Sequence, residues 1–216
     1  KAFPYIFDME AAQHVLDVFD TFKYTKGKWR GKPFKIMPWQ AFIVSTVYGW
    51  YHMKTGKRRF RDVYVKVPRK NAKTELLIGI AQYGFIFEGE IDPEIYWFAT
   101  KKDQAKIGWQ RQKVMTEDMI KEVPAIAEYC SVSMYSIFTK EGLGWSKYLS
   151  KDSKSEDGPS PYYGIGDEYH AQTDDSMIEV IESGMGARDN PILFRITTAG
   201  NSFGSPCTMH EEFCEH

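Results

Sequence analysis

Three clusters of polar side chains in this sequence have residue types that could act on a phosphate group. The first cluster spans residues 67–74 and ends in Lys73 and Thr74. A phosphate-binding loop aims backbone N–H groups inward and adds a lysine for the β- and γ-phosphates and a hydroxyl for Mg²⁺. Lys73 and Thr74 fit the last two roles. Val67 and Ala72 stand where the Walker A consensus has glycine, so a basic turn before a helix also fits this segment.

The second cluster is the acidic pair Asp167 and Glu168, which follows the apolar residues 162–166. In metal-assisted phosphoryl transfer, an aspartate at such a position holds Mg²⁺ and a neighbouring glutamate orients or deprotonates the attacking water. Adjacent carboxylates at a strand end also repel each other unless a cation is present, which favours a metal site. An acidic strand end that caps the following helix is the alternative.

The third cluster spans residues 196–201 and contains Thr197, Thr198 and Asn201. Hydroxyl and amide groups at the end of a strand could sense the γ-phosphate of a bound nucleotide. Residues of these types are also common in ordinary turns, so this cluster alone does not decide between the two interpretations.

The segments around these clusters predict strands that alternate with helices. We expect helices at 8–24, 39–53, 73–87, 102–121 and 174–184, and strands at 62–67, 94–99, 131–138, 145–149, 162–166 and 192–197. This alternation predicts an α/β fold with a mostly parallel central sheet flanked by helices. Such folds bind ligands beyond the carboxyl ends of their strands, where all three clusters lie. Their order is that of the P-loop NTPases of the additional-strand, catalytic-Glu type.

Composition and charge narrow the choice of partners. Hydrophobic residues make up 43% of the 216 residues and charged residues 26%, which is typical of a soluble globular protein. The formal net charge of −1 argues against a generally basic nucleic-acid binder, so contacts with DNA must come from local patches. The candidate patches are Lys54, Lys57, Arg58, Arg59 and Arg61, and the pair Lys101 and Lys102. The longest apolar stretch, residues 76–87, is too short to span a bilayer.

Taken together and in order, these motifs resemble the ATPase half of the large terminase subunits of tailed bacteriophages. The segments that carry the resemblance are 38–40, 69–74, 99–105, 167–170 and 197–201. The resemblance implies an enzyme that uses ATP and Mg²⁺, and whose hydrolysis of ATP powers the movement of double-stranded DNA into a procapsid. A helicase-like nucleic-acid translocase and a catalytically weak nucleotide-binding assembly module are the alternatives.

The resemblance also implies roles for single residues in catalysis and in holding the metal. Lys73 matches the lysine of the phosphate loop, and Glu168 matches the catalytic carboxylate. Thr74 and Asp167 match the Mg²⁺ ligands. Arg69 matches a basic residue at the head of the loop that stabilises γ-phosphate charge within the same chain.

Further nucleotide contacts follow from the same resemblance. Gln40 matches a glutamine that reads adenine. The other expected contacts are Lys70, Asn71, Ala72, Thr198 and Asn201. Ala72 departs from the family pattern, which has glycine there, and its Cβ would restrict the loop.

Ring motors commonly insert an arginine from a neighbouring subunit into the active site. Arg188 lies in a loop between the second and third clusters and is the first candidate for this trans arginine finger, and Arg111 is the second. A local salt bridge is the alternative for each of them. The expected partners are double-stranded DNA, a homo-oligomeric ring (a pentamer when assembled), the portal protein and the small terminase subunit. No membrane is expected, and the expected location is the host cytoplasm.

We expect a single ATPase domain over residues 1–216. Residues 1–60 form a helical extension on the adenine side, and residues 61–205 form the P-loop core. Residues 206–216 begin a linker to a C-terminal nuclease domain, and nuclease activity is expected only in that further domain.

Overall fold

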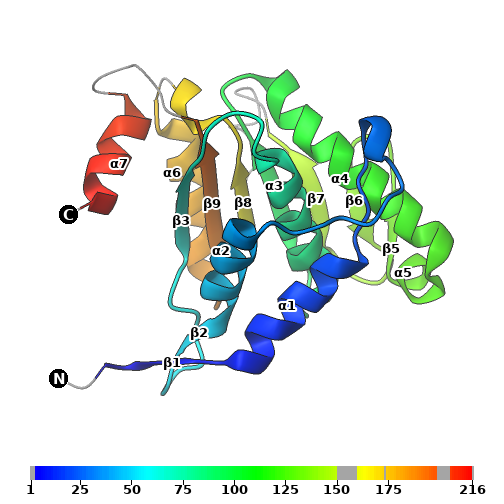
Figure 1. The fold of residues 1–216 in the computed structure, drawn as a ribbon, viewed down its shortest axis with the longest axis horizontal. Coiled ribbons are helices and arrows are strands. Elements are labelled where there is room, and N and C mark those ends of the chain that lie inside the picture. Colours follow the sequence, from blue (N-terminus) through cyan, green and yellow to red (C-terminus); the bar gives the residue numbers. More distant parts are fainter. Residues whose placement is uncertain (1–2, 150–159, 173, 199–204, 216) are drawn as a thin grey trace.

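A seven-stranded sheet forms the centre of the molecule (Figure 1), with the strand order β3-β9-β8-β4-β7-β6-β5. The computed structural model describes residues 3–149, 160–172, 174–198 and 205–215. The strands of the sheet are β3 (Asp62–Lys66), β4 (Glu94–Phe98), β5 (Cys130–Val132), β6 (Ile137–Thr139), β7 (Trp145–Tyr148), β8 (Tyr163–Gly166) and β9 (Ile192–Thr197).

The five strands β3, β9, β8, β4 and β7 run parallel, and β6 and β5 continue the sheet antiparallel at one edge. The predicted fold class, a mostly parallel sheet flanked by helices, is therefore confirmed. In space β9 lies between β3 and β8, so the strand before the third polar cluster separates the strands before the first and the second. The loops from β3 to α3 and from β4 to α4 both leave the sheet at its upper edge in Figure 1.

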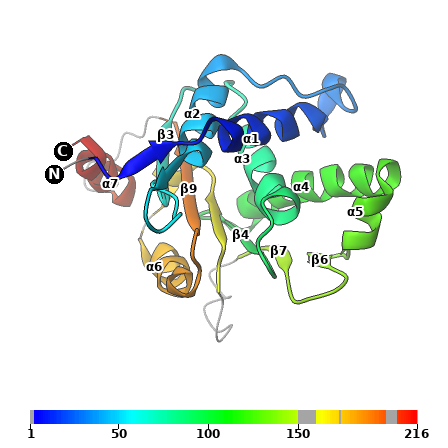
Figure 2. The ribbon, with the colours of Figure 1, turned by 90° about the horizontal axis from the view of Figure 1, so that it is seen from below.

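Helices cover both faces of the sheet (Figure 2), with α1, α2 and α3 on one side and α6 on the other. Leu76, Trp97 and Phe194 belong to the larger apolar core, whereas Phe98 and Leu193 belong to a second core against α6. Successive residues of β4 and β9 thus point to opposite faces, as a pleated strand requires. The helices are α1 (Met9–Thr21), α2 (Pro38–Gly49), α3 (Lys73–Gln82), α4 (Lys102–Glu122), α5 (Pro124–Tyr129), α6 (Ser176–Gly184) and α7 (Pro206–Glu215). None of the helices within the described ranges is long and apolar enough to cross a bilayer.

The helix predicted at residues 39–53 ends earlier than expected. α2 stops at Gly49, and β2 (Trp50–His52) pairs antiparallel with β1 (Tyr5–Phe7). A Cβ at residue 49 would lie 2.4 Å from the Phe7 ring, so glycine allows the N-terminal strand to approach. The Trp50 and Phe7 rings, whose centroids are 5.3 Å apart, then favour the pairing of the strands over another helical turn.

The single strand predicted at residues 131–138 is also wrong. Cys130–Val132 and Ile137–Thr139 form two antiparallel strands joined by a turn. The Ser133 hydroxyl accepts hydrogen bonds from the backbone N–H groups of Tyr135 and Ser136, at 3.2 and 2.9 Å, and thereby stabilises the turn.

Residues 206–215, predicted to begin a linker, form the helix α7, which packs against the edge strand β3. Cys207 is buried, and its sulfur lies 3.4 Å from the Tyr64 hydroxyl. Lys66 and Glu211 add an ion pair between β3 and α7.

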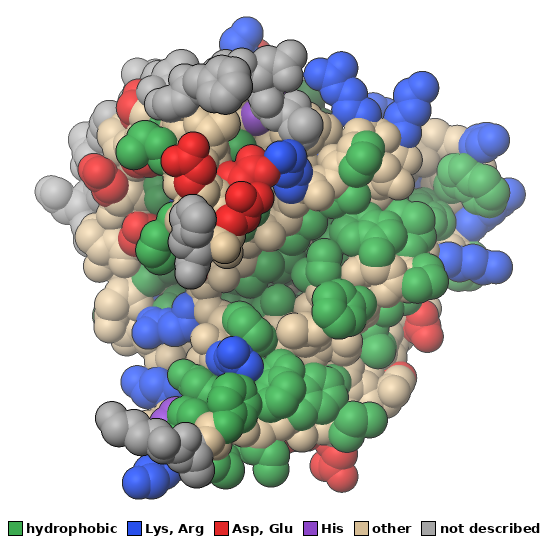
Figure 3. All heavy atoms as spheres, turned by 60° about the vertical axis from the view of Figure 1, so that its left-hand side comes forward, with side chains coloured by type: hydrophobic (Ala, Val, Ile, Leu, Met, Phe, Trp, Pro, Cys, Tyr) green, Lys and Arg blue, Asp and Glu red, His purple; other side chains and the backbone are tan. Residues whose placement is uncertain are grey.

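An apolar groove remains open beside β3. Figure 3 shows exposed apolar side chains on this side of the molecule. The groove has a volume of about 420 Å³, and its lining includes Phe42 and Ile43 of α2 and Val63 and Val65 of β3. The Phe42 side chain is 70% exposed. Apolar surface beside an unpaired strand edge is an unusual feature of a soluble monomer.

A buried ion pair joins the basic segment at residues 54–61 to the helix after the phosphate loop. Arg58 pairs with Glu88, and their side chains are only 1% and 11% exposed. The Arg58 guanidinium also donates to the Tyr163 hydroxyl at 3.4 Å. Burial of this arginine shows that part of the predicted DNA-binding patch is structural.

Replacing Glu88 with glutamine leaves the buried guanidinium of Arg58 without its counter-charge. We expect Glu88→Gln to lower the free energy of unfolding by about 3 kcal/mol, because an unpaired charge then stays buried. Urea denaturation of the full chain measures the change. Asp189→Asn removes the exposed partner of Lys57 and is the matched control, with a change too small to resolve. Equal losses in the two variants would contradict the prediction.

Candidate active site

The first and second polar clusters meet at the carboxyl edge of the sheet. The Thr74 hydroxyl, in the first turn of α3, donates a hydrogen bond of 3.1 Å to Oδ2 of Asp167, which directly follows β8. These residues are 93 positions apart in the sequence. The predicted meeting of the basic loop with the acidic strand end is thus present in the structure.

A cavity of about 440 Å³ lies over this contact. Its size falls within the range of roughly 300–1,000 Å³ that is usual for ligand pockets. Six of the predicted site residues line it, namely Arg69, Lys70, Ala72, Lys73, Thr74 and Glu168. Glu75, Gln104, His170 and Ala171 complete the lining and had been given no role in nucleotide binding. Gln104 could have been found from the sequence, because it lies in the first turn of a helix that follows a strand end.

The loop between β3 and α3 has an unusual backbone. Lys70 and Ala72 have φ angles of +68° and +51°, in the left-handed region that favours glycine. The Asn71 side chain stabilises the loop by donating to the carbonyl of Pro68 at 3.1 Å. The Cβ at position 72 is therefore accommodated with strain, and backbone strain of this kind is concentrated at functional sites.

Lys73 is 7% exposed and begins α3. Its amine donates to the carbonyls of Val67 and Pro68, at 3.4 and 3.3 Å, within its own loop. Neutral carbonyls are weaker partners for an ammonium group than anionic oxygens are. Phosphate oxygens entering the cavity could therefore replace them.

Burial raises the pKa of Asp167, and the neighbouring Glu168 carboxylate raises it further. The hydrogen bonds from the Thr74 hydroxyl and from the Glu168 N–H, together with the charge of Lys73, act in the opposite direction without cancelling the shift. The site therefore has an excess of negative charge that a divalent cation would neutralise.

The donor set around Asp167 suits Mg²⁺. It consists of a threonine hydroxyl and carboxylate oxygens, which are hard oxygen ligands. In the described part of the chain, no group of three or more His, Cys, Asp or Glu residues could hold a metal ion. An ion at Thr74 and Asp167 would thus take its other ligands from water and phosphate oxygens, as Mg²⁺ commonly does.

Glu168 also has a left-handed backbone, with a φ angle of +53°. Its Oε2 lies 3.3 Å from Nδ1 of His170, and the same nitrogen lies 2.9 Å from the Thr197 hydroxyl. The Thr197 hydroxyl also accepts a hydrogen bond from the His170 backbone N–H at 3.0 Å. His170 thus connects the second cluster with the end of β9, where the third cluster begins.

Gln40 does not lie in the cavity, and the structure indicates a different role from the predicted contact with adenine. Its side chain is fully buried. Oε1 accepts from the Met37 backbone N–H at 2.9 Å, and Nε2 donates to the Ala72 carbonyl at 3.2 Å. Gln40 therefore joins the start of α2 to the phosphate loop and supports the loop from behind.

The other predicted nucleotide contacts are more distant from the cavity. Thr198 is 5% exposed and borders a separate hollow of about 460 Å³ with Val67 and Pro68 on the other side of the loop. Asn71 acts on the loop backbone, as described above. Asn201 lies outside the described residues.

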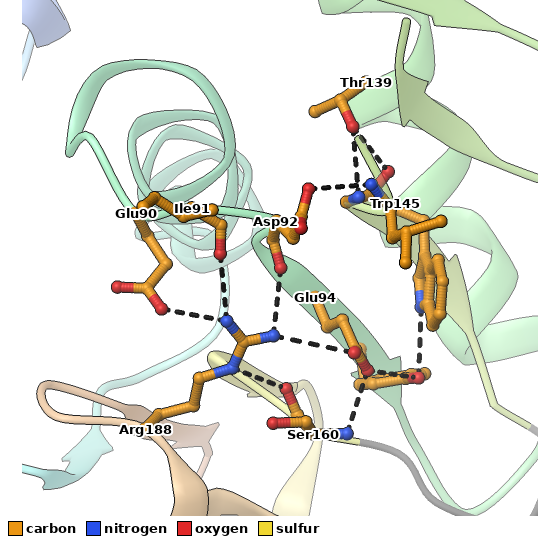
Figure 4. Close-up of polar contacts among 11 residues, drawn as sticks. Glu90, Ile91, Asp92, Glu94, Thr139, Trp145, Ser160 and Arg188 are labelled. Carbon is orange, nitrogen blue, oxygen red and sulfur yellow. Dashed lines mark hydrogen bonds and ion pairs between the residues drawn. The ribbon is translucent and has the colours of Figure 1, made fainter. Parts of the chain in front are cut away.

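Arg188 does not have the free guanidinium that a trans arginine finger requires, so this prediction is wrong for the described structure. It lies at the opposite edge of the sheet, before β9, and all five of its N–H groups have an acceptor within 3.5 Å (Figure 4). The acceptors are the carbonyls of Ser160, Ile91 and Asp92 and the carboxylates of Glu90 and Glu94. Arg188 thus holds together the loops before β4, β8 and β9.

Arg111, the second candidate, is bound within the chain as well. Nη2 lies 2.5 Å from Oε1 of Glu75, and Nε donates to the Thr25 hydroxyl at 3.3 Å. This ion pair fixes α4 against the first turn of α3, and Glu75 itself lines the cavity.

A parallel sheet with a lysine-containing loop after one strand and an acidic pair after another defines a P-loop nucleoside triphosphatase. Residues 38–216 match the family described as "Terminase large subunit, ATPase domain". The chain belongs to this family and is an ATPase domain, so ATP is its nucleotide.

Solved structures of phage terminases have the same fold. The large terminase of bacteriophage HK97 superposes with a TM-score of 0.75 at 21% identity, over 94% of this chain and 41% of that one. The ATPase domain of the Thermus phage P74-26 large terminase gives 0.50 at 16% identity, over 66% of this chain and 61% of that one. Protein YmfN of Escherichia coli K12 is 34% identical over 89 residues, which are 39% of this chain and 19% of that protein. The chain thus spans less than two thirds of each of these proteins.

Removing the negative charge of Asp167 should stabilise the protein in the absence of metal. We expect Asp167→Asn to have a higher free energy of unfolding than the wild type at pH 7. The folded-state pKa of Asp167 lies above its unfolded value, so its favourable contribution is complete below the unfolded pKa and is lost as the pH rises through the folded pKa. The advantage of the variant should therefore shrink as the pH is lowered from 7 toward about 4.

Urea denaturation of the full chain in EDTA, across this pH range, measures the difference. Glu212→Gln on the exposed side of α7 is the control for loss of a carboxylate elsewhere. A variant that is less stable than the wild type at pH 7 would refute the electrostatic account of Asp167.

The left-handed backbone at residue 72 predicts an inverted order of stabilities. Ala72→Val should lower the free energy of unfolding by about 1–2 kcal/mol, because a β-branched residue is strained there. Ala72→Gly should be at least as stable as the wild type. Ala127→Gly, in the helix α5, should instead lose about 1 kcal/mol. Thermal and urea denaturation of the three variants test the order, which fails if glycine destabilises both positions equally.

Proposed function

We propose that this chain binds ATP and Mg²⁺ in the cavity over the Thr74–Asp167 contact and hydrolyses the bond between the β- and γ-phosphates. The energy released powers the translocation of viral double-stranded DNA into a procapsid, with the chain as the motor domain of a large terminase subunit. The observation that carries the proposal is the convergence of Lys73, Thr74, Asp167 and Glu168, which come from two distant segments, at one cavity.

Each side chain has a role that follows from its position. Lys73 exchanges its loop carbonyls for β- and γ-phosphate oxygens, and Arg69 and Lys70 add positive charge at the mouth of the cavity. Thr74 and Asp167 hold Mg²⁺, which when bound neutralises phosphate charge. Glu168 orients the attacking water and accepts its proton as the water oxygen bonds to the γ-phosphorus and the bond to the β-phosphate oxygen breaks.

The assembly in which the domain works is part of the same proposal. The chain acts as one subunit of a homo-oligomeric ring, a pentamer, docked on the portal protein of a procapsid in the host cytoplasm. The small terminase subunit delivers the DNA, and a further nuclease domain cuts it. Lys101 and Lys102 are exposed at the same edge of the sheet as the cavity, where they could contact the phosphate backbone of DNA.

A catalytically weak nucleotide-binding module is the second candidate. Two observations favour it, namely the strained Ala72 in the place of glycine and the internal hydrogen bonds of Lys73. Both would weaken the binding of a nucleotide without changing the fold. Calorimetric titration of the full chain with a non-hydrolysable ATP analogue and Mg²⁺ separates the two candidates from a protein that does not bind ATP, and turnover separates them from each other.

Substitution of Glu168 tests the proposed chemistry. We expect Glu168→Gln to lower kcat for ATP at least about 100-fold, since a general base contributes roughly 10²–10⁴. Its affinity for the ATP analogue should stay within about threefold of wild type, whereas Lys73→Ala should lose binding. Steady-state phosphate release with double-stranded DNA present measures kcat, and Glu212→Gln is the control. Unchanged turnover in Glu168→Gln would remove Glu168 from the mechanism.

A further inference from the structure

The hydroxyl of Thr100 is buried and has no hydrogen-bond partner within the described residues. Thr100 lies between the end of β4 at Phe98 and the start of α4 at Lys102. An unpaired buried hydroxyl costs about 1–3 kcal/mol, so native proteins rarely keep one without a reason. The position of this hydroxyl at the edge of the sheet that carries the cavity indicates what the reason is.

The other buried polar atoms without a partner differ from Thr100 in kind. Three of them are spare N–H groups of side chains that are otherwise engaged, in Arg58, Gln112 and Arg195. The last is the indole nitrogen of Trp39, which can only donate. Thr100 is thus the single hydroxyl among the unpartnered buried atoms of the described segments, and its hydrogen-bonding capacity is wholly unused.

The strand register places Thr100 beside Glu168. β4 and β8 are parallel neighbours in which Phe98 pairs with Gly166. The Asp167 N–H continues the ladder with a bond of 3.4 Å to the Phe98 carbonyl. Thr100 and Glu168 each lie two residues beyond the last pair, and parallel neighbours are about 4.8 Å apart. The two chains therefore leave the sheet together.

Glu168 is flanked by two possible partners. On the side of β9, its carboxylate contacts His170, which is held by Thr197. On the side of β4 is Thr100, whose hydroxyl is unused. The Glu168 side chain is 35% exposed and lines the cavity, so it has room to change its partner.

We propose that Thr100 is a positioning residue for Glu168. In the hydrolytic state its hydroxyl donates a hydrogen bond to the Glu168 carboxylate and aligns it with the attacking water, and the contact with His170 holds the glutamate in a resting position. This inference rests on the proposed function, because it assigns a partner to the glutamate that activates water.

The same placement would make hydrolysis responsive to DNA. Lys101 and Lys102 directly follow Thr100 and are exposed. Contact of these lysines with a DNA backbone would bear on the segment that carries the Thr100 hydroxyl. Glu168 would then be aligned more often when DNA is bound.

Isosteric substitution of Thr100 tests the proposal. Thr100→Val removes only the hydroxyl and should lower kcat for ATP about 10–100-fold, the loss expected for a hydrogen bond to a charged group. KM for ATP should stay within about twofold, and Thr100→Ser should restore at least half of kcat, because it keeps the donor. The Tm of Thr100→Val should not fall, since the hydroxyl has no partner to lose. Thr46→Val in α2 is the matched control.

The assays use the full chain with ATP and Mg²⁺, with and without linear double-stranded DNA. In Lys101→Ala/Lys102→Ala, the ratio of the two rates should fall toward one. A wild-type kcat in Thr100→Val, alongside an inactive Glu168→Gln, overturns the role of Thr100 while the proposed function stands. A lowered kcat with an equally lowered Tm, not restored by serine, overturns it in favour of a structural role. An unchanged ratio in the lysine variant overturns the link to DNA, and absence of hydrolysis by the wild type overturns the proposed function and this inference together.

Discussion

The hydrogen bond from Thr74 to Asp167 depends on the whole architecture. It joins two segments 93 positions apart, and it forms only because β3 and β8 run parallel on either side of β9. Parallel strands place their carboxyl ends at the same edge, so the start of α3 and the residues after β8 face each other there. The buried apolar strands β4, β8 and β9 have little freedom to shift, and the distance between the two segments is therefore maintained.

The two edges of the sheet treat charge in opposite ways. At the amino edge, Arg58 is neutralised by Glu88, and Arg188 has an acceptor for every N–H group. At the carboxyl edge, Asp167 and Glu168 are adjacent carboxylates, and the pKa of Asp167 is raised. Satisfied charges stabilise a fold, whereas unsatisfied ones favour the binding of a ligand. The molecule is thus anchored at one edge and kept reactive at the other.

Backbone strain follows the same division. Of the non-glycine residues with positive φ in the described ranges, Lys70, Ala72 and Glu168 line the cavity, and Asp92 belongs to the loops held by Arg188. Unpaired charge and strained backbone both reduce stability. The large apolar core and the buried ion pair at Arg58 offset that loss, which explains how a marginally stable domain can keep a strained site.

The sequence by itself determined the type of fold, most of its elements and the segments that form the site. Periodicity and polar strand ends are local signals, and they correctly indicated the alternating elements, the lysine loop and the acidic pair. It missed the end of α2 at Gly49, the helix α7 and the partners of Gln40 and Arg188, because each depends on a contact with a distant segment. Only the tertiary structure decided that β9 lies between β3 and β8, that Gln40 supports the loop from behind, and that Thr100 is buried beside Glu168. The physical reason is that residue type sets what a side chain can bind, whereas packing decides which partners come within reach and which hydrogen bonds remain unmade.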